Sequence, residues 1–228
     1  MKEYDSEKWS LIAYECYLMG DIENFFEENP IVGKTIKNIY FIGYSGYNDS
    51  YDIREKCAWH YGEHDDALYQ KYLVWANIPD DFEVDRHVEI NEPIVIQFTD
   101  GTSLEMMYFD YDYNNMKISV NEITHYPKQD MEDNFTNIDA NVMFSVCLGK
   151  KIAGVECIPS TPDDDDIGKL ILRLSDGNGI LITVVYDEEA YSHNGLECVD
   201  KDNKTLMITF GELKPGMILK DGEELEEI

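Results

Sequence analysis

Residues 60–64, HYGEH, form the motif with the most specific chemical implication in this chain. They fit H-x-x-E-H, in which two histidines one helical turn apart hold a Zn²⁺ and the glutamate polarises a bound water. Gly62 disfavours the helix that this geometry requires, and two aspartates follow where apolar residues usually pack. We therefore expect solvated helix residues here. His60 and His64 are candidate metal ligands, and a zinc-dependent hydrolase using Glu63 is one alternative function.

Two further motifs are incomplete. Residues 33–35, GKT, resemble the end of a phosphate-binding loop, but Glu28 stands where the first glycine is required, so nucleotide binding is rejected. Residues 110–114, DYDYN, begin like a calcium loop, but Asn115 replaces its glycine and Glu122 falls one residue beyond the bidentate position. A polar hairpin turn is the preferred interpretation, and a calcium-binding module is the alternative. No serine or histidine has the context of an activated nucleophile, so we expect no enzymatic activity and no cofactor.

The chain carries a formal net charge of −29, from 47 Asp and Glu against 18 Lys and Arg over 228 residues. This is far more negative charge than solubility requires of a small domain. Such a field repels DNA, RNA and anionic membranes, and it attracts basic surfaces at raised association rates. We therefore expect a basic protein as the partner, with no direct nucleic-acid or membrane contact. The oligomeric state is left open.

Aromatic side chains are interleaved with carboxylates in residues 48–92, which hold twelve Asp and Glu against four Lys and Arg. Tyr and Trp supply buried area in protein interfaces, and charges supply steering and register. A similar mixture recurs at 108–113, and four consecutive aspartates occupy 163–166. The candidate partner-binding residues are Tyr51, Asp52, Trp59, Glu63, Asp65, Asp66, Tyr69, Asp80, Asp81, Asp110, Asp112, Asp163, Asp164, Asp165 and Asp166. The alternative interpretation is that residues 48–92 contain an amphipathic helix with a solvated acidic face and that residues 163–166 form a solvated loop.

The charge, the aromatic and acidic insertion and the missing catalytic motif favour a non-enzymatic inhibitor of a basic, nucleic-acid-handling protein. Carboxylates at a phosphate-like density compete for the Lys and Arg side chains of a nucleic-acid channel, which is nucleic-acid mimicry. An immunity protein against a nuclease toxin and a phage anti-CRISPR-type inhibitor of a CRISPR effector both fit. Fifteen Lys against three Arg are typical of an AT-rich bacterial or phage gene. A structural or accessory scaffold protein of a larger assembly is the main alternative.

Two blocks of sequence occur twice in the same order. VGKTIKNIYFI at 32–42 matches LGKKIAGVECI at 148–158, and IVIQFTDG at 94–101 matches LILRLSDG at 170–177. The offset is 116 residues for the first block and 76 for the second, so the first copy holds 40 extra residues. We expect an internal duplication, in which the glycine of each first block forms a turn that enters a strand.

The expected elements follow from the spacing of apolar residues. Alternation predicts strands at 116–120, 170–174 and 206–210, and Asp-Gly pairs at 100–101 and 176–177 predict hairpin turns. Helical spacing predicts helices over 5–27 and 53–76. The fold class expected is α+β, with mainly antiparallel β-sheet from two imperfect repeats, an N-terminal helix and a helical insertion in the first repeat. The expected units are an N-terminal helical segment at 1–30, a first repeat at 31–126 with the acidic helical insertion at 48–92, and a second repeat at 137–228.

The five cysteines are widely spaced and contain no C-x-x-C pair. This usage is typical of free, mostly buried thiols in a reducing compartment. The N-terminus lacks a charged segment followed by an apolar run, and no apolar stretch approaches 18 residues. We therefore expect no signal peptide and no membrane span, and we predict a cytoplasmic location.

Overall fold

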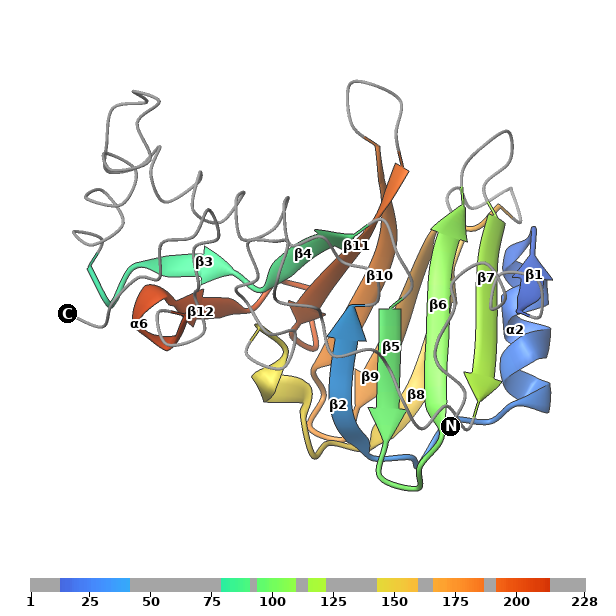
Figure 1. Cartoon of the computed structure of the whole chain (residues 1–228). Helices are drawn as coiled ribbons and strands as arrows, with labels where there is room; N and C mark the ends of the chain where they lie inside the picture. Colours follow the sequence, from blue (N-terminus) through green and yellow to red (C-terminus); the bar gives the residue numbers. More distant parts are fainter. Residues whose placement is uncertain are drawn as a thin grey trace, which may run out of the picture.

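The computed structural model describes residues 13–41, 79–90, 94–109, 115–121, 143–159, 166–186 and 192–213. This part is mostly antiparallel β-sheet with few helices (Figure 1). In chain order its elements are β1 (Tyr14–Cys16), α2 (Met19–Glu28), β2 (Ile36–Phe41), β3 (Glu83–Asp85), β4 (His87–Ile90), β5 (Ile94–Phe98), β6 (Ser103–Phe109), β7 (Asn115–Asn121), η1 (Ser145–Cys147), β8 (Ile152–Ile158), β9 (Lys169–Leu174), β10 (Gly179–Tyr186), β11 (Ser192–Val199), β12 (Met207–Thr209) and α6 (Phe210–Leu213). None of the helices in it is long and apolar enough to cross a membrane.

Two five-stranded sheets have the same internal order. The first runs β1-β7-β6-β5-β2 and the second runs β4-β11-β10-β9-β8. The strands β8 to β11 form a meander of four consecutive antiparallel strands, and β2, β5, β6 and β7 form the corresponding meander, with β3 and β4 inserted between β2 and β5 in the chain. A short strand is added at the equivalent edge of each meander, β1 beside β7 and β4 beside β11. β4 precedes the first meander's β5 in the chain but joins the second sheet, so the two halves of the sequence are interleaved in space.

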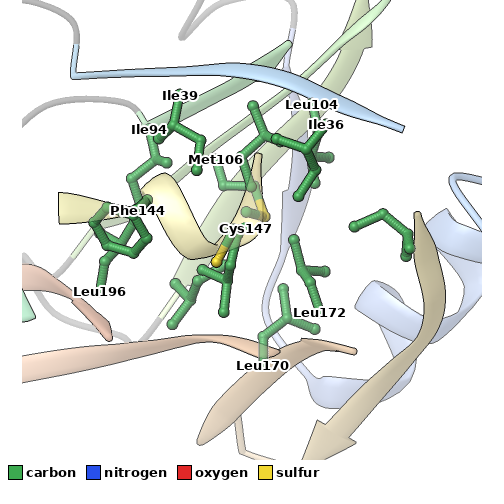
Figure 2. Packing of buried hydrophobic residues seen from close by; sticks show 14 of the residues in the cluster. Ile36, Ile39, Ile94, Leu104, Met106, Phe144, Cys147, Leu170, Leu172 and Leu196 are labelled. Atoms are coloured by element: carbon green, nitrogen blue, oxygen red, sulfur yellow. The ribbon is translucent and has the colours of Figure 1, made fainter. Parts of the chain in front are cut away.

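The two sheets pack face to face around one hydrophobic core (Figure 2). Alternate residues of each strand point inward because side-chain direction along a strand has a period of two. Ile96 and Phe98 of β5 and Leu172 of β9 are fully buried in this way. Helix α2 packs its buried Ile22 and Phe25 into the same core, alongside β8. The other side of the core is filled by Phe144, which lies near Ile94 and Leu196 (Figure 2).

The two predicted Asp-Gly hairpin turns are confirmed. Gly101, between β5 and β6, and Gly177, between β9 and β10, have φ of 90° and 95°. In both loops the glycine amide donates to the carbonyl of the last residue of the preceding strand. The closing hydrogen bonds, from the Phe98 amide to the Thr102 carbonyl and from the Leu174 amide to the Asn178 carbonyl, each enclose three residues. The glycine is the third of these and lies in the left-handed region, the backbone conformation that a side chain opposes.

The starts of β2 and β8 exchange reciprocal hydrogen bonds, and we call this contact the seam. The Gly33 amide donates to the Ile152 carbonyl with an N···O distance of 2.8 Å. At the matching position the Gly149 amide donates to the Ile36 carbonyl at 2.9 Å. Both glycines have positive φ, and each of the two strands has a register irregularity just after its first residue. Blocks with similar sequences therefore occupy equivalent places in the two sheets.

Three sequence-based boundaries differ from the structure. The predicted helix over 5–27 is wrong at residues 14–16, which form the edge strand β1, and the helix observed begins at Met19. The predicted strand at 206–210 is shorter, because Phe210 already begins α6. The end of the insertion at 48–92 holds the strands β3 and β4, whereas the helix predicted at 53–76 lies outside the described residues.

Candidate partner-binding surface

Three of the predicted partner-binding residues are described, and the structure does not bring them together. Asp80 and Asp81 are exposed just before β3, whereas Asp166 is exposed beside Leu18, close to β1 and α2. These two regions lie on opposite sides of the sandwich (Figure 1). The other predicted residues, together with His60 and His64, lie outside the described residues; they are Tyr51, Asp52, Trp59, Glu63, Asp65, Asp66, Tyr69, Asp110, Asp112, Asp163, Asp164 and Asp165.

Three large hydrophobic side chains are exposed on β1 and in the turn that leads from it to α2. Tyr14 is 49% exposed, Tyr17 50% and Leu18 44%. The Tyr14 ring lies against Phe25 of α2, with 5.8 Å between ring centroids. This contact fixes one side of the Tyr14 ring and leaves the rest of it in solvent. Exposed aromatic rings that are already held in place are well suited to bind a partner, because little side-chain freedom is lost on binding.

Asp21 determines where this exposed segment turns into the helix. Its Oδ2 accepts hydrogen bonds from the backbone amides of Tyr17 and Leu18 at 2.9 and 3.0 Å. A carboxylate in the first turn satisfies amides that have no partner within the helix and interacts favourably with the helix dipole. Cys16 and Ile22, on either side of this turn, are fully buried. The turn therefore holds Tyr17 and Leu18 outward while its neighbours enter the core.

Residues 13–33 contain five Asp and Glu and no Lys, Arg or His. Glu15, Glu23, Glu27 and Glu28 are exposed, and Asp166 joins them through its β-bridge with Leu18. The Glu15 carboxylate accepts a hydrogen bond from the Tyr17 hydroxyl and raises the Tyr17 pKa. We call Tyr14, Tyr17 and Leu18, with these five exposed carboxylates, the aromatic acidic face.

A second acidic surface lies on the opposite side of the sandwich, where β3, β12 and α6 form a small arm (Figure 1). Glu83 pairs with Thr209 and Asp85 pairs with Met207, which is 42% exposed. Both acidic residues of β3 are exposed, and Asp80 and Asp81 immediately precede them. Four carboxylates therefore occupy one short segment of the arm.

The hydrogen bonds of Arg86 fasten the arm to the sandwich. Its side chain is 4% exposed and donates from Nε to the Met207 carbonyl of β12 at 2.9 Å. Its Nη1 donates to the Met143 carbonyl at 2.5 Å and to the Ser145 hydroxyl at 3.2 Å. Glu212 of α6 lies 3.8 Å from its Nη2. The guanidinium of Arg86 is thus turned inward at the base of the arm.

The backbone of α6 approaches the start of the arm closely at Gly211. The Gly211 amide donates to the Asp80 carbonyl at 2.9 Å. A Cβ at Gly211 would lie 3.1 Å from both the Cβ and the carbonyl oxygen of Asp80. Glu212 caps the same short helix by accepting from the amide and hydroxyl of Thr209, which lowers the Glu212 pKa. These contacts set the position of the exposed Asp80.

Several described cations are already paired with carboxylates of the chain. Lys34 Nζ lies 2.5 Å from Asp100, and this hydrogen bond, with those from Thr102, lowers the Asp100 pKa to about 2. Lys150 pairs with Asp176 at 3.0 Å in the equivalent position of the second sheet. These two pairs neutralise carboxylates near the seam.

The described residues contain no group of three or more His, Cys, Asp or Glu placed to hold a metal ion. Comparisons of the chain with protein-family models, with curated proteins and with solved structures find no match. Its function must therefore be inferred from its own residues.

Sequence reasoning missed the aromatic acidic face because it placed Tyr14 and Tyr17 inside the helix predicted over 5–27. The signal that marks the face is Asp21, an acidic residue placed to satisfy amides at a helix start. Reading Asp21 as a first-turn residue shifts the helix start toward residue 19. It then leaves Tyr14 and Tyr17 outside the helix, as the structure has them.

Proposed function

We propose that this chain is a non-enzymatic binding protein that inhibits or neutralises a basic, nucleic-acid-handling protein. The observation that supports this proposal best is the aromatic acidic face, where Tyr14 and Tyr17 are half exposed among carboxylates in a segment without a cation. Aromatic anchors account for much of the binding energy in protein interfaces, and surrounding charges select the partner. A partner that presents Lys and Arg around an apolar pocket complements this face in both respects.

The net charge of −29 gives the proposal its kinetic argument. Long-range attraction raises association rates by roughly 10- to 1,000-fold over those of uncharged pairs and is weakened by salt. A nucleic-acid-binding channel already carries Lys and Arg side chains, which would attract the negative charge of this chain. A toxin-immunity protein and an anti-CRISPR-type inhibitor remain the two settings that fit, and both act in the cytoplasm of a bacterium.

We further propose that the two sheets descend from one duplicated four-strand unit. The repeated sequence blocks support this, as do the reciprocal amide bonds of Gly33 and Gly149 and the equivalent pairs Lys34–Asp100 and Lys150–Asp176. On this proposal the added segments, which carry the aromatic acidic face and the arm, are the parts that distinguish the two halves. The duplicated unit would then be the scaffold, and the additions would carry binding.

The proposal is tested by affinity capture from lysate of the native host with three forms of the chain. The first is the wild type. The second replaces Glu15, Glu23, Glu27 and Glu28 by Gln, leaving the capping residue Asp21 intact. The third replaces Asp80, Asp81, Glu83 and Asp85 by the corresponding amides, so the two variants lose equal charge from different surfaces.

Captured proteins are eluted with a salt gradient and identified by mass spectrometry. We expect a basic nuclease or nucleic-acid-binding protein to leave the wild type by a few hundred millimolar salt, about the range in which surface charges are screened. We expect the face variant to lose it and the arm variant to retain it. Equal loss from both variants would assign binding to net charge alone, and recovery of the bait without a basic protein would refute the proposal.

A scaffold role is the second candidate, because Tyr14, Tyr17 and Leu18 also form an apolar surface suited to self-association. Sedimentation velocity separates the two functions. A scaffold predicts concentration-dependent assembly that persists in high salt and is abolished by Tyr17→Ala. The inhibitor predicts that the free chain sediments as one species under both conditions.

A further inference from the structure

Two buried thiols are in contact within the hydrophobic core. Cys147, the last residue of η1, and Cys198 of β11 are both 0% exposed, and their Sγ atoms are 3.6 Å apart. Cys147 lies in the core with Met106 and Leu172 (Figure 2). A disulfide has an S–S distance of about 2.05 Å, so the two sulfurs must approach by about 1.5 Å to bond.

The pair lies where η1, β11 and the base of the arm meet. The Cys198 amide donates to the Arg86 carbonyl at 2.9 Å, and the Leu206 amide donates to the Cys198 carbonyl at 2.7 Å, just before β12. On the other side, Met143 and Ser145 next to Cys147 accept hydrogen bonds from the Arg86 side chain. A covalent bond between the two sulfurs would join the segments that Arg86 holds by hydrogen bonds.

We propose that Cys147 and Cys198 form an oxidation site, a dithiol that a low-molecular-weight disulfide such as oxidised glutathione converts to an intramolecular disulfide. One protein thiolate attacks a glutathione sulfur, breaks its S–S bond and releases one glutathione thiolate, leaving a mixed disulfide. The second protein thiolate attacks the protein sulfur of that mixed disulfide and releases the second glutathione. Two protein thiols are oxidised and one glutathione disulfide is reduced to two thiols, so electrons and protons balance.

Burial determines when this reaction occurs. The contact with Cys147 and the surrounding apolar residues raise the pKa of the Cys198 thiol, and only a thiolate attacks a disulfide. The pair therefore reacts in molecules that open locally or are still folding, and the bond is sheltered once the core closes. Burial also raises the pKa of Cys16 to about 12 and that of Cys157 to about 11. These thiols should therefore also react slowly in the folded protein, and a low reaction rate by itself does not identify Cys147 and Cys198 as the oxidised pair. The contact geometry is what singles out Cys147 and Cys198.

The bond would close a long loop, because the two residues are 51 positions apart. Cross-linking such a loop restricts the unfolded chain and stabilises the folded one. The proposal is independent of what the protein binds, since it concerns the core and the base of the arm.

The test uses the full chain and oxidised glutathione. The protein is incubated with a mixture of oxidised and reduced glutathione in a urea concentration that opens a minority of molecules, and the urea is then removed. Remaining thiols are blocked with N-ethylmaleimide, and the unreduced protein is digested for peptide mapping. We expect a Cys147–Cys198 linked peptide, three blocked thiols out of five cysteines, and a melting temperature raised by about 5–10 °C.

Five blocked thiols, glutathione adducts without a protein disulfide, or a dominant link between other cysteines would each overturn the proposal. Two variants serve as controls: Cys157→Ser should still gain the thermal shift, and Cys147→Ala should not. Because the peptide map is made on the wild-type chain, the result stands even if Cys147→Ala fails to fold.

Discussion

Replacing Arg86 by Met removes the hydrogen bonds between the arm and the sandwich while keeping a long side chain in the same space. The guanidinium is 4% exposed and donates to two backbone carbonyls, those of Met143 and Met207, as well as to Ser145. A buried acceptor that loses its donor costs about 1–3 kcal/mol. Part of that loss is offset because a buried charge is removed as well. We expect the free energy of unfolding to fall by about 3 kcal/mol.

The charge partner does not add to this loss. Glu212 lies 3.8 Å from Arg86 but its side chain is 56% exposed, so water solvates it after the substitution. The same substitution at Arg173 is the matched control. Arg173 makes a bidentate pair with Glu156, which is 47% exposed, and also donates to the Asp200 carbonyl and the Asn203 side chain. Because Glu156 and Asn203 are exposed, water can replace these partners, and we expect a smaller loss than at Arg86.

Urea unfolding followed by circular dichroism measures both variants, and hydrogen exchange reports the arm separately. The Cys198 amide donates to the Arg86 carbonyl, and the Leu206 amide donates to the Cys198 carbonyl. We expect Arg86→Met to increase the hydrogen-exchange rate of both amides much more than Arg173→Met does. A loss below about 1 kcal/mol for Arg86→Met, or equal losses for the two variants, would refute the assigned role of Arg86.

Two further predictions concern stability. Gly101→Ala and Gly177→Ala should each cost about 1–2 kcal/mol, because both residues have positive φ. Gly154→Ala should cost much less, because Gly154 does not have positive φ and a Cβ there meets no atom within 4 Å; thermal unfolding of the three variants checks this. Acid should remove stability contributed by Asp100, because its pKa is lowered from 3.8 to about 2 by Lys34 and Thr102. That contribution is complete above the unfolded pKa near 4 and disappears as the pH falls toward 2, so Asp100→Asn should be less stable than wild type at pH 6 but similar to it at pH 2. Equal destabilisation by Asp100→Asn at both pH values would show that the carboxylate charge is not involved.

Strands and hairpins were predictable wherever the information was local. Alternation at 116–120 and 170–174 identified core residues of β7 and β9, among them Ile118 and Leu172, because one face of each strand packs into the core. It did not predict that Ile171, on the opposite face of β9, is buried as well. The glycines at 101 and 177 marked the turns, because few other residues tolerate their backbone conformation.

Other parts of the fold depend on contacts between distant segments. Residues 14–16 match a helical pattern as well as a strand pattern, and pairing with β7 decides the outcome. β4 joins the second sheet by pairing with β11, more than one hundred positions later in the chain. No local pattern specifies that pairing.

The candidate site was only partly predictable for a related reason. Charge and aromatic composition indicated the kind of surface. The folded chain then showed that Tyr14, Tyr17 and Leu18 are exposed within five positions of one another, next to the exposed Glu15. Asp166 is the predicted site residue that the structure places beside them.

The association rate of the chain with its captured basic partner, measured over a range of salt concentrations, tests the central proposal most directly. For the wild type we expect the rate constant to fall by at least about tenfold between low and physiological salt. We expect the face variant with four Glu→Gln changes to associate more slowly at low salt than the arm variant of equal charge, and Tyr17→Ala to raise the dissociation rate instead. A rate that does not depend on salt, together with unchanged binding by the face variant and by Tyr17→Ala, would contradict the account.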